Sequence, residues 1–307
     1  MPAANPDRLT RRAAIAALIA AAATGCSRAE FFAVNFPAVF GSYQRHTDLP
    51  YGEDAKQRLD VYVPNNPGVA PRAMVVFWHG GRWSYGDKSD YRFVGAALAE
   101  LGCVAVLPNY RHYPEVKLPG FMQDAARAAR WAETHAADYG VEPQRLYLMG
   151  HSAGAHMAVL VALDLRYVAA IGAPPANIAG VIGLSGPYDF LPLREADVKD
   201  MFGPPPLYPD SQPINFVRAG APPMLLVHGL RDNVVWPRNA VNLSAALQAR
   251  GVPVTLKLYP RLTHSDTVAV LSRPLRSRAP IFSDIGAFVS PAPKSQAALA
   301  VASGGWA

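Results

Sequence analysis

The stretch LMGHSAG, residues 148–154, contains the pattern Gly-x-Ser-x-Gly between a short apolar segment and a helical one. This pattern predicts a strand, a sharp turn and a helix, with Ser152 on the turn and its hydroxyl held above the edge of a sheet. Glycines are needed at the flanking positions because larger side chains would collide there. Ser152 is therefore a candidate nucleophile, and the rest of the chain has to supply the groups that activate it.

The segments around this turn alternate between two kinds of pattern. An alternating strand that ends at a proline is followed by short apolar, mostly β-branched runs, which are typical of strands covered on both faces of a parallel sheet. Longer Ala-rich runs, three of which end at a glycine, are typical of helices. The predicted strands are residues 59–64, 74–78, 103–107, 145–149, 181–184, 224–227 and 254–258, and the predicted helices are residues 91–101, 121–139, 153–165 and 238–250. This order predicts an α/β fold with a mostly parallel central sheet flanked by helices.

The length and composition favour one large domain. The chain has 307 residues, of which 50% are hydrophobic, and we place the domain at residues 40–290. Residues 186–223, after the strand at 181–184, carry many prolines and exceed an ordinary connection, so they are a small cap or a plain insertion. A cap is favoured because loops at the carboxyl ends of parallel strands border the ligand crevice. Residues 291–307, rich in Ala, Ser, Gly and Pro, are expected to be a disordered tail.

Two side chains downstream of Ser152 can activate it. A serine hydroxyl is a weak nucleophile at neutral pH, so it needs a base and an acid that orients the base. Asp232 follows the strand at 224–227, and His264 is the only one of the eight histidines that lies beyond this aspartate. The order Ser, Asp, His therefore indicates a triad of Ser152 as nucleophile, Asp232 as acid and His264 as base. Asp189, which also follows a strand, is the alternative acid.

The run WHGGRW, residues 78–83, indicates a site for a negatively charged oxygen. Glycines directly after a strand let the backbone approach a substrate closely. We expect the N–H groups of Gly80 and Gly81 to join that of Ala153 in stabilising the oxyanion of a tetrahedral intermediate.

Five aromatic residues near the ends of loops are candidate walls of a substrate pocket. They are Trp83, Tyr85, Phe190, Phe202 and Trp236. The alternative for each of them is simple packing.

Residues 1–25 have the composition of an export signal. Three arginines, at positions 8, 11 and 12, precede an apolar run at 13–23 that is short for a membrane span and ends in small residues before Cys26. This order predicts a signal peptide. Its ending resembles the lipobox of bacterial lipoproteins, which implies lipidation of Cys26 and a periplasmic or membrane-anchored protein. Ordinary secretion is the alternative.

The charge of the chain does not indicate nucleic-acid binding. The formal net charge of +6 falls to +4 when residues 1–25, with three arginines and one aspartate, are removed. The remaining lysines and arginines are scattered and form no basic helix, so nucleic acid is not an expected partner. Cys103 lies in an apolar run and is expected to be a buried thiol.

From about residue 43 to residue 289 the chain resembles the α/β-hydrolase carboxylesterases of the hormone-sensitive-lipase and bacterial feruloyl-esterase-like group. The segments that carry this resemblance are LDVY (59–62), HGG (79–81), NYR (109–111), GHSAG (150–154), and HG (228–229) with Asp232. The resemblance implies the α/β-hydrolase fold, the triad, and a serine esterase that forms an acyl-enzyme from a small-molecule ester without a metal ion or cofactor.

Two other functions are compatible with these motifs. Arg82 replaces a third glycine of the lipase-like pattern, and HGGRW also resembles the motif of kynurenine formamidases, so arylformamidase activity is an alternative. A non-catalytic binding module on the same fold is a further one.

Overall fold

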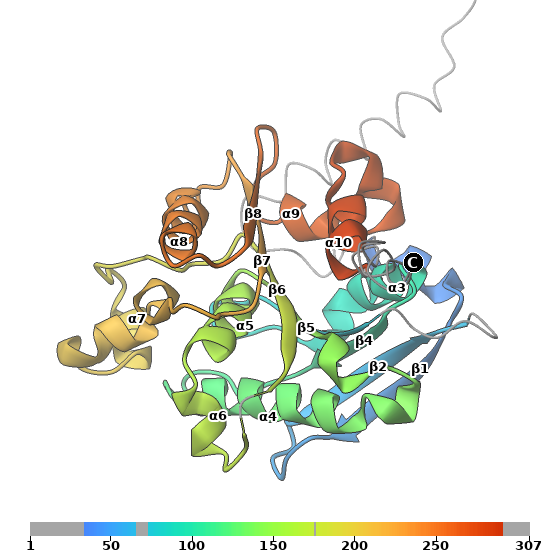
Figure 1. Ribbon diagram of the computed structural model, residues 1–307, viewed down its shortest axis with the longest axis horizontal. Coiled ribbons are helices and arrows are strands. Elements are labelled where there is room, and N and C mark those ends of the chain that lie inside the picture. The colour runs from blue at the N-terminus through green and yellow to red at the C-terminus, as the bar shows by residue number, and fades with distance from the viewer. Residues whose placement is uncertain (1–33, 66–72, 175, 291–307) are drawn as a thin grey trace, which may run out of the picture.

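The computed structural model describes residues 34–65, 73–174 and 176–290, which contain one eight-stranded sheet in the order β1-β2-β4-β3-β5-β6-β7-β8 (Figure 1). The strands β1, β2 and β4 pair antiparallel, whereas all neighbours from β4 to β8 pair parallel. The mostly parallel sheet predicted from the sequence is confirmed. The bounds are β1 (Tyr43–Pro50), β2 (Arg58–Pro64), β3 (Met74–Trp78), β4 (Val104–Pro108), β5 (Leu146–His151), β6 (Ile178–Leu184), β7 (Met224–Gly229) and β8 (Val254–Tyr259).

Helices cover both faces of the sheet (Figure 1). One layer consists of α3 (Arg92–Glu100), α9 (Asp266–Ala269) and α10 (Ile281–Val289), and the other of α4 (Gly120–His135), α5 (Ala153–Leu163), α6 (Arg166–Ala170) and α8 (Arg238–Ala249). Successive strand residues point to opposite faces, so Val76 packs in the core under α4 and α5, and Phe77 packs in the core under α3 and α10. Because the strands are buried on both sides, they are apolar at nearly every position, which is the pattern visible in the sequence.

Helix α5 begins directly after the candidate nucleophile and is buried along its whole length. Its sequence AGAHMAVLVAL has no polar face to turn toward water. The surrounding strands and helices therefore hold its first turn in a fixed position, and Ser152 precedes that turn.

Two strands differ from the sequence-based expectation. β1 was not predicted, because this edge strand is mostly half-buried or exposed and its residues YQRHTDLP show little apolar periodicity. β8 was expected to be covered on both faces, which is wrong: it is the last strand of the sheet, and none of its residues is fully buried. The four predicted helices are confirmed as α3, α4, α5 and α8.

Residues 186–223 contain α7 (Ala196–Met201) and two 3-10 helices, η6 (Pro205–Ser211) and η7 (Pro213–Phe216). The other short 3-10 helices are η2 (Phe36–Phe40), η3 (Lys88–Tyr91), η4 (Ala137–Tyr139), η5 (Pro143–Arg145) and η8 (Arg273–Arg278). The insertion follows β6, as the sequence suggested, and its packing on α5 through η7 joins it to the domain core.

Several sequence-based predictions concern the two ends of the chain. The predicted signal peptide at 1–25, the lipidation site Cys26 and the predicted tail at 291–307 lie outside the described residues. In the part of the chain that is described, no helix is both long and apolar enough to cross a membrane. Cys103 is buried, as predicted.

Candidate active site

Ser152 lies on a strained turn between β5 and α5. Its backbone has φ of 54° and ψ of −120°, a conformation that residues other than glycine rarely adopt. The Ser152 N–H donates to the carbonyl of Leu184 in the neighbouring strand at 2.9 Å, which holds the turn against β6. A Cβ atom on Gly154 would lie 2.0 Å from the carbonyl oxygen of Trp78, so only glycine fits where the first turn of α5 crosses β3. The predicted strand–turn–helix is therefore present, with a non-glycine residue in the strained position.

Asp232 lies in the turn after β7, and its side chain is fully buried. Its Oδ1 accepts hydrogen bonds from the N–H groups of Val234 and Val235, at 3.0 and 2.9 Å. Burial by itself would raise the pKa of Asp232, but hydrogen bonds from His228, His264 and Val235 outweigh it and hold the pKa well below the usual range. Asp232 is thus an ionised carboxylate inside the protein.

His264, in the loop after β8, is the direct partner of this carboxylate. Its Nδ1–H donates to Asp232 Oδ2 at 2.8 Å. With Nδ1 carrying the proton, the other ring nitrogen of a neutral imidazole has a lone pair and can accept a proton. The pair therefore has the orientation that a general base requires.

The loop of His264 packs against the turn of Ser152. The ring of His151, which precedes Ser152, packs against the ring of His264 with centroids 4.9 Å apart and planes inclined by 46°. The Nε2–H of His151 donates to the backbone carbonyl of His264 at 3.1 Å, and the hydroxyl of Thr267 donates to the same carbonyl at 2.9 Å. Burial, and then the neighbouring His264, lower the pKa of His151 to about 3, so it remains neutral beside the base.

The alternative acid has a different partner. Asp189 accepts a hydrogen bond from the Asn242 amide at 2.7 Å, and its N–H donates to the side chain of Asn239. The carboxylate bound to His264 belongs to Asp232 instead. The geometry therefore favours Asp232 over Asp189.

The glycine loop after β3 approaches the nucleophile closely. A Cβ on Gly80 would lie 3.1 Å from the Cβ of Ser152. Gly81 has φ of +122°, and a Cβ there would lie 1.9 Å from the carbonyl oxygen of Tyr85. Ala153 is the first residue of α5, where helical N–H groups have no partner within the helix. All three predicted oxyanion residues thus belong to the segments that meet at Ser152.

Polar side chains tether this glycine loop to the sheet. The Lys88 N–H donates to Asn109 Oδ1 at 2.6 Å, and the amide of Asn109 donates to Asp87 Oδ2 at 2.7 Å. Lys88 Nζ also donates to Asp60 Oδ1 at 2.7 Å, where the Asp60 side chain is fully buried. The Asp of LDVY and the Asn of NYR therefore hold the segment that follows HGG.

The five predicted pocket walls fall into two groups. Trp83, Phe190 and Phe202 form an aromatic cluster around His156, with the Trp83 ring 5.0 Å from the rings of both His156 and Phe202. Tyr85 and Trp236 lie on the surface with 59% and 58% of their area exposed. That these five residues contact a substrate stays a prediction.

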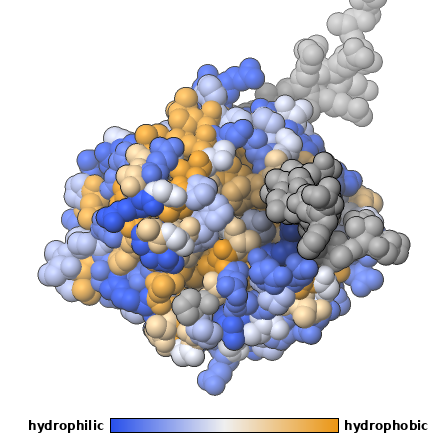
Figure 2. Space-filling view, viewed as in Figure 1, coloured by the Kyte–Doolittle hydropathy of each residue, from blue (hydrophilic) through white to orange (hydrophobic). Residues whose placement is uncertain are grey.

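Apolar residues flank the acid on the outside of the molecule. The turn at 230–236 exposes Leu230, Val234 and Trp236 around the buried Asp232. Figure 2 shows that apolar side chains form patches in the middle of the face in view, bordered by hydrophilic ones. Exposed apolar groups beside a site are typical of surfaces that receive an apolar ligand.

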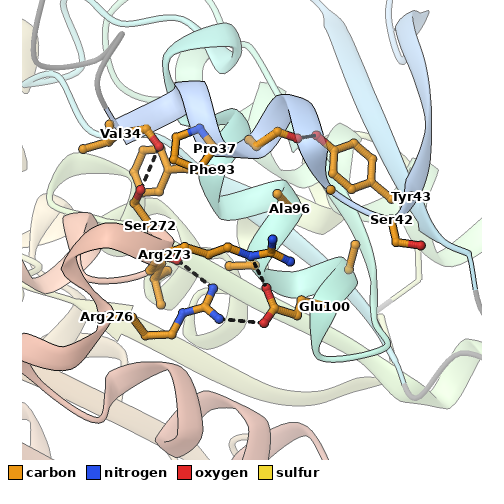
Figure 3. Close-up of a pocket in the computed structure, with 15 residues that line it drawn as sticks. Val34, Pro37, Ser42, Tyr43, Phe93, Ala96, Glu100, Ser272, Arg273 and Arg276 are labelled. Atoms are coloured by element: carbon orange, nitrogen blue, oxygen red, sulfur yellow. Dashed lines mark hydrogen bonds and ion pairs between the residues drawn. The ribbon is translucent and has the colours of Figure 1, made fainter.

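A separate pocket lies between η2, α3 and η8 (Figure 3). Its charged lining residues pair with one another, because Glu100 accepts from Arg273 at 3.1 Å and from Arg276 at 2.7 Å. Its lining includes none of the predicted site residues that the structure describes. The pocket is therefore distinct from the candidate active site.

One contact of the acid was missed from the sequence. His228, which the sequence showed only as part of the HG segment at 228–229, places Nε2 3.2 Å from Asp232 Oδ2. The sequence held one signal for this contact: His228 lies at the end of the strand that precedes the turn of Asp232, four residues before it.

The mostly parallel sheet, the strained serine turn and the Asp–His pair at the same edge of the sheet define the α/β-hydrolase fold. The chain belongs to the BD-FAE family, whose model matches residues 59–247. The matched segment contains Ser152, Asp232 and the glycine loop, and ends before His264.

Relatives with curated names are esterases. The chain is 30% identical over 270 residues to the isoprenylcysteine alpha-carbonyl methylesterase ICME of Arabidopsis thaliana, an alignment that covers 80% of this chain and 62% of the relative. It is 29% identical over 250 residues to the probable carboxylic ester hydrolase LipM of Mycobacterium tuberculosis, with coverage of 74% and 57%. The chain thus spans about three fifths of the length of these relatives.

Solved structures show the same fold. Esterase B from Lactobacillus rhamnosis superimposes with a TM-score of 0.68 at 23% identity, covering 92% of this chain and 96% of the esterase. At this level of identity the likeness establishes the fold.

Proposed function

We propose that the protein is a serine hydrolase of carboxylic esters, with Ser152, His264 and Asp232 as its triad. The observation that carries the proposal is the 2.8 Å hydrogen bond from His264 Nδ1 to the buried, ionised Asp232, in a loop that packs on the strained turn of Ser152. Membership of the BD-FAE family and the esterase names of the relatives support it.

In the first half of the reaction Ser152 Oγ attacks the ester carbonyl carbon while His264 Nε2 takes the hydroxyl proton. Asp232 keeps its negative charge and stabilises the imidazolium that forms. The N–H groups of Gly80, Gly81 and Ala153 donate to the tetrahedral oxyanion. His264 then returns the proton to the departing alcohol, which leaves an acyl-enzyme.

In the second half a water molecule loses a proton to His264 and attacks the acyl carbon. Collapse of the second tetrahedral intermediate releases the acid, and the proton returns to Ser152. His151 assists this cycle by staying neutral: with its pKa near 3, it adds no second positive charge beside the imidazolium of His264.

The substrates we propose are small esters with an apolar part. The exposed Leu230, Val234 and Trp236 border the turn of the acid and offer apolar surface to such a molecule. A methyl ester of a prenylated cysteine belongs in a substrate panel, because the Arabidopsis relative is named for that activity. The relatives give no support to the formamidase alternative.

The proposal is tested by active-site labelling and by ester hydrolysis, each measured for the wild-type protein and for Ser152→Ala. The wild-type protein is expected to react with a fluorophosphonate probe and to hydrolyse short p-nitrophenyl esters. Ser152→Ala is expected to lose the label and at least about 10⁴-fold of kcat. Retention of most activity by Ser152→Ala would refute the triad, and turnover of N-formylkynurenine in preference to esters would replace the esterase by a formamidase.

A further inference from the structure

We propose that His228 is a positioning residue for the triad, a second histidine donor that orients the carboxylate of Asp232 toward His264. The inference rests on the proposed esterase function. It concerns a side chain that lies outside the triad and the oxyanion residues.

His228 precedes the last residue of β7, and its side chain is fully buried. Its Nε2 lies 2.8 Å from the carbonyl oxygen of Val235 and 3.2 Å from Asp232 Oδ2. A carbonyl oxygen can only accept, so the proton of the ring is on Nε2. This single N–H is shared between the backbone at the far end of the turn and the carboxylate of the acid.

The contact completes the coordination of Asp232. Oδ1 accepts two backbone N–H groups, from Val234 and Val235, and Oδ2 accepts the Nδ1–H of His264 while Nε2 of His228 lies 3.2 Å from the same oxygen. A carboxylate offers about four lone-pair directions; three of them have a hydrogen-bond donor here, and His228 faces the fourth. With His228 beside Oδ2, the carboxylate has less freedom to rotate away from His264.

The two ring nitrogens of His228 differ in their partners. Among the described residues, Nδ1 of His228 has no hydrogen-bond partner although it is buried. A buried unpaired acceptor is unfavourable for stability, and an apolar side chain of similar size would avoid it. What an apolar side chain cannot provide is the Nε2–H to Asp232 and Val235.

The titratable groups that act on this cluster are histidines. His264 donates to Asp232, His228 lies 3.2 Å from the same carboxylate oxygen, and His151 packs against His264 from the end of β5. Loss of the His228 N–H removes a dipole that stabilises the negative charge of Asp232, so the carboxylate attracts the His264 imidazolium more strongly. The acid limb of the activity profile, which is the fall of kcat at low pH, is therefore expected to move to higher pH.

The test compares His228→Leu, which removes the donor, with His228→Gln, whose amide can place an N–H near the position of Nε2. The full-length protein is used, and kcat and KM for p-nitrophenyl acetate are measured from about pH 5 to about pH 9. We expect His228→Leu to lose about 10- to 100-fold in kcat, the range of one hydrogen bond to a charged group, with KM nearly unchanged. We also expect its acid limb to shift upward, and His228→Gln to restore both the limb and most of kcat.

Leu226→Val is the matched control for a loss of stability. Leu226 lies in the same strand, is buried on the face under α5 and α8, and is not among the residues bonded to Asp232. The midpoint of thermal unfolding of the Leu226→Val variant is expected to fall, while the acid limb of its activity profile stays at the wild-type pH.

The outcomes separate the two proposals. If wild-type activity requires Ser152 and His264 but His228→Leu keeps its acid limb and its kcat within about twofold, His228 has no positioning role. If the limb of Leu226→Val shifts as well, the effect of His228→Leu is one of stability and the inference is wrong. If the wild-type protein neither hydrolyses esters nor reacts with the fluorophosphonate at Ser152, the proposed function itself fails.

Discussion

The imidazole of His264 donates to the carboxylate of Asp232 at 2.8 Å, although the two residues are 32 positions apart in the chain. Parallel strands β7 and β8 are neighbours in the sheet, so the loops at their carboxyl ends lie side by side. This adjacency brings an acid and a base from separate loops into contact. It also places the pair at the same edge of the sheet as the serine turn after β5.

Asp232→Asn is expected to lower kcat/KM by about 10³- to 10⁴-fold, because an amide can donate to the imidazole and favour the wrong tautomer. Steady-state kinetics on a short ester would measure the effect. Asp189→Asn is the control, since that carboxylate pairs with Asn242 instead of His264. Equal losses in the two variants would remove the basis for choosing Asp232.

Gly80→Ala is expected to lower kcat by about 10- to 100-fold, less than or comparable to the loss of one oxyanion donor. The added Cβ would lie 3.1 Å from both the Cβ of Ser152 and Nδ1 of His151, so the loop has to move away from the nucleophile. Gly172→Ala is the control for kcat: nothing lies within 4 Å of an added Cβ, and its φ of +69° makes the substitution a strained one far from Ser152 in the sequence. An unchanged kcat in Gly80→Ala would argue against the oxyanion assignment.

Lys88→Met is expected to destabilise the fold by about 3 kcal/mol, the lower end of the range for breaking a buried pair, because Arg45 still compensates Asp60. Since Lys88 Nζ also ties the segment after the glycine loop to Asp60, kcat is expected to fall several-fold. Chemical denaturation would measure the first effect. Lys117→Met breaks a pair with Asp200 whose side chains are 49% and 52% exposed, so its loss should be below about 1 kcal/mol.

The fold is expected to lose stability as the pH falls from about 6.5 toward 4. Burial lowers the pKa of His151 to about 3 and that of His156 to about 4, whereas both titrate near 6.5 in the unfolded chain. In this window the unfolded chain binds these protons and the native protein does not. Each histidine therefore reduces the free energy of unfolding by about 1.4 kcal/mol per pH unit, a contribution that is absent above the unfolded pKa.

His156→Gln checks the origin of this slope. The amide can still donate to the carbonyl of Ser211, which His156 Nε2 contacts at 2.7 Å, but it cannot take up a proton. Urea unfolding at a series of pH values should show a shallower slope in the variant. Identical slopes would mean that His156 does not contribute.

Cys26→Ser is expected to abolish acylation and membrane partitioning of the exported protein, if the ending of the apolar run at 13–23 acts as a lipobox. Metabolic labelling with a fatty acid and fractionation of membranes would measure both. A variant that still partitions and still carries the label would contradict the anchor.

Much of the fold was predictable because burial on both faces leaves a direct trace in the sequence. The strands at the centre of the sheet are apolar throughout, and their positions agreed with the structure. The edge strands β1 and β8 contact water, so their composition is mixed; one was missed and the other was expected to be buried. A hydrophobicity pattern identifies a strand by the burial of its residues. In a strand at the edge of the sheet only some residues are buried, so the pattern does not distinguish it from a loop or from a central strand.

The sequence by itself determined that Ser152 sits on a turn between a strand and a helix, and that an aspartate and a histidine follow it in the order a triad requires. Only the tertiary structure showed that Asp232 bonds to His264 while Asp189 bonds to Asn242, and only it placed His228 beside the same carboxylate oxygen as His264. The reason is physical: strand and turn propensities act over a few neighbouring residues, whereas a hydrogen bond depends on tenths of an ångström between groups that packing of the whole sheet brings together.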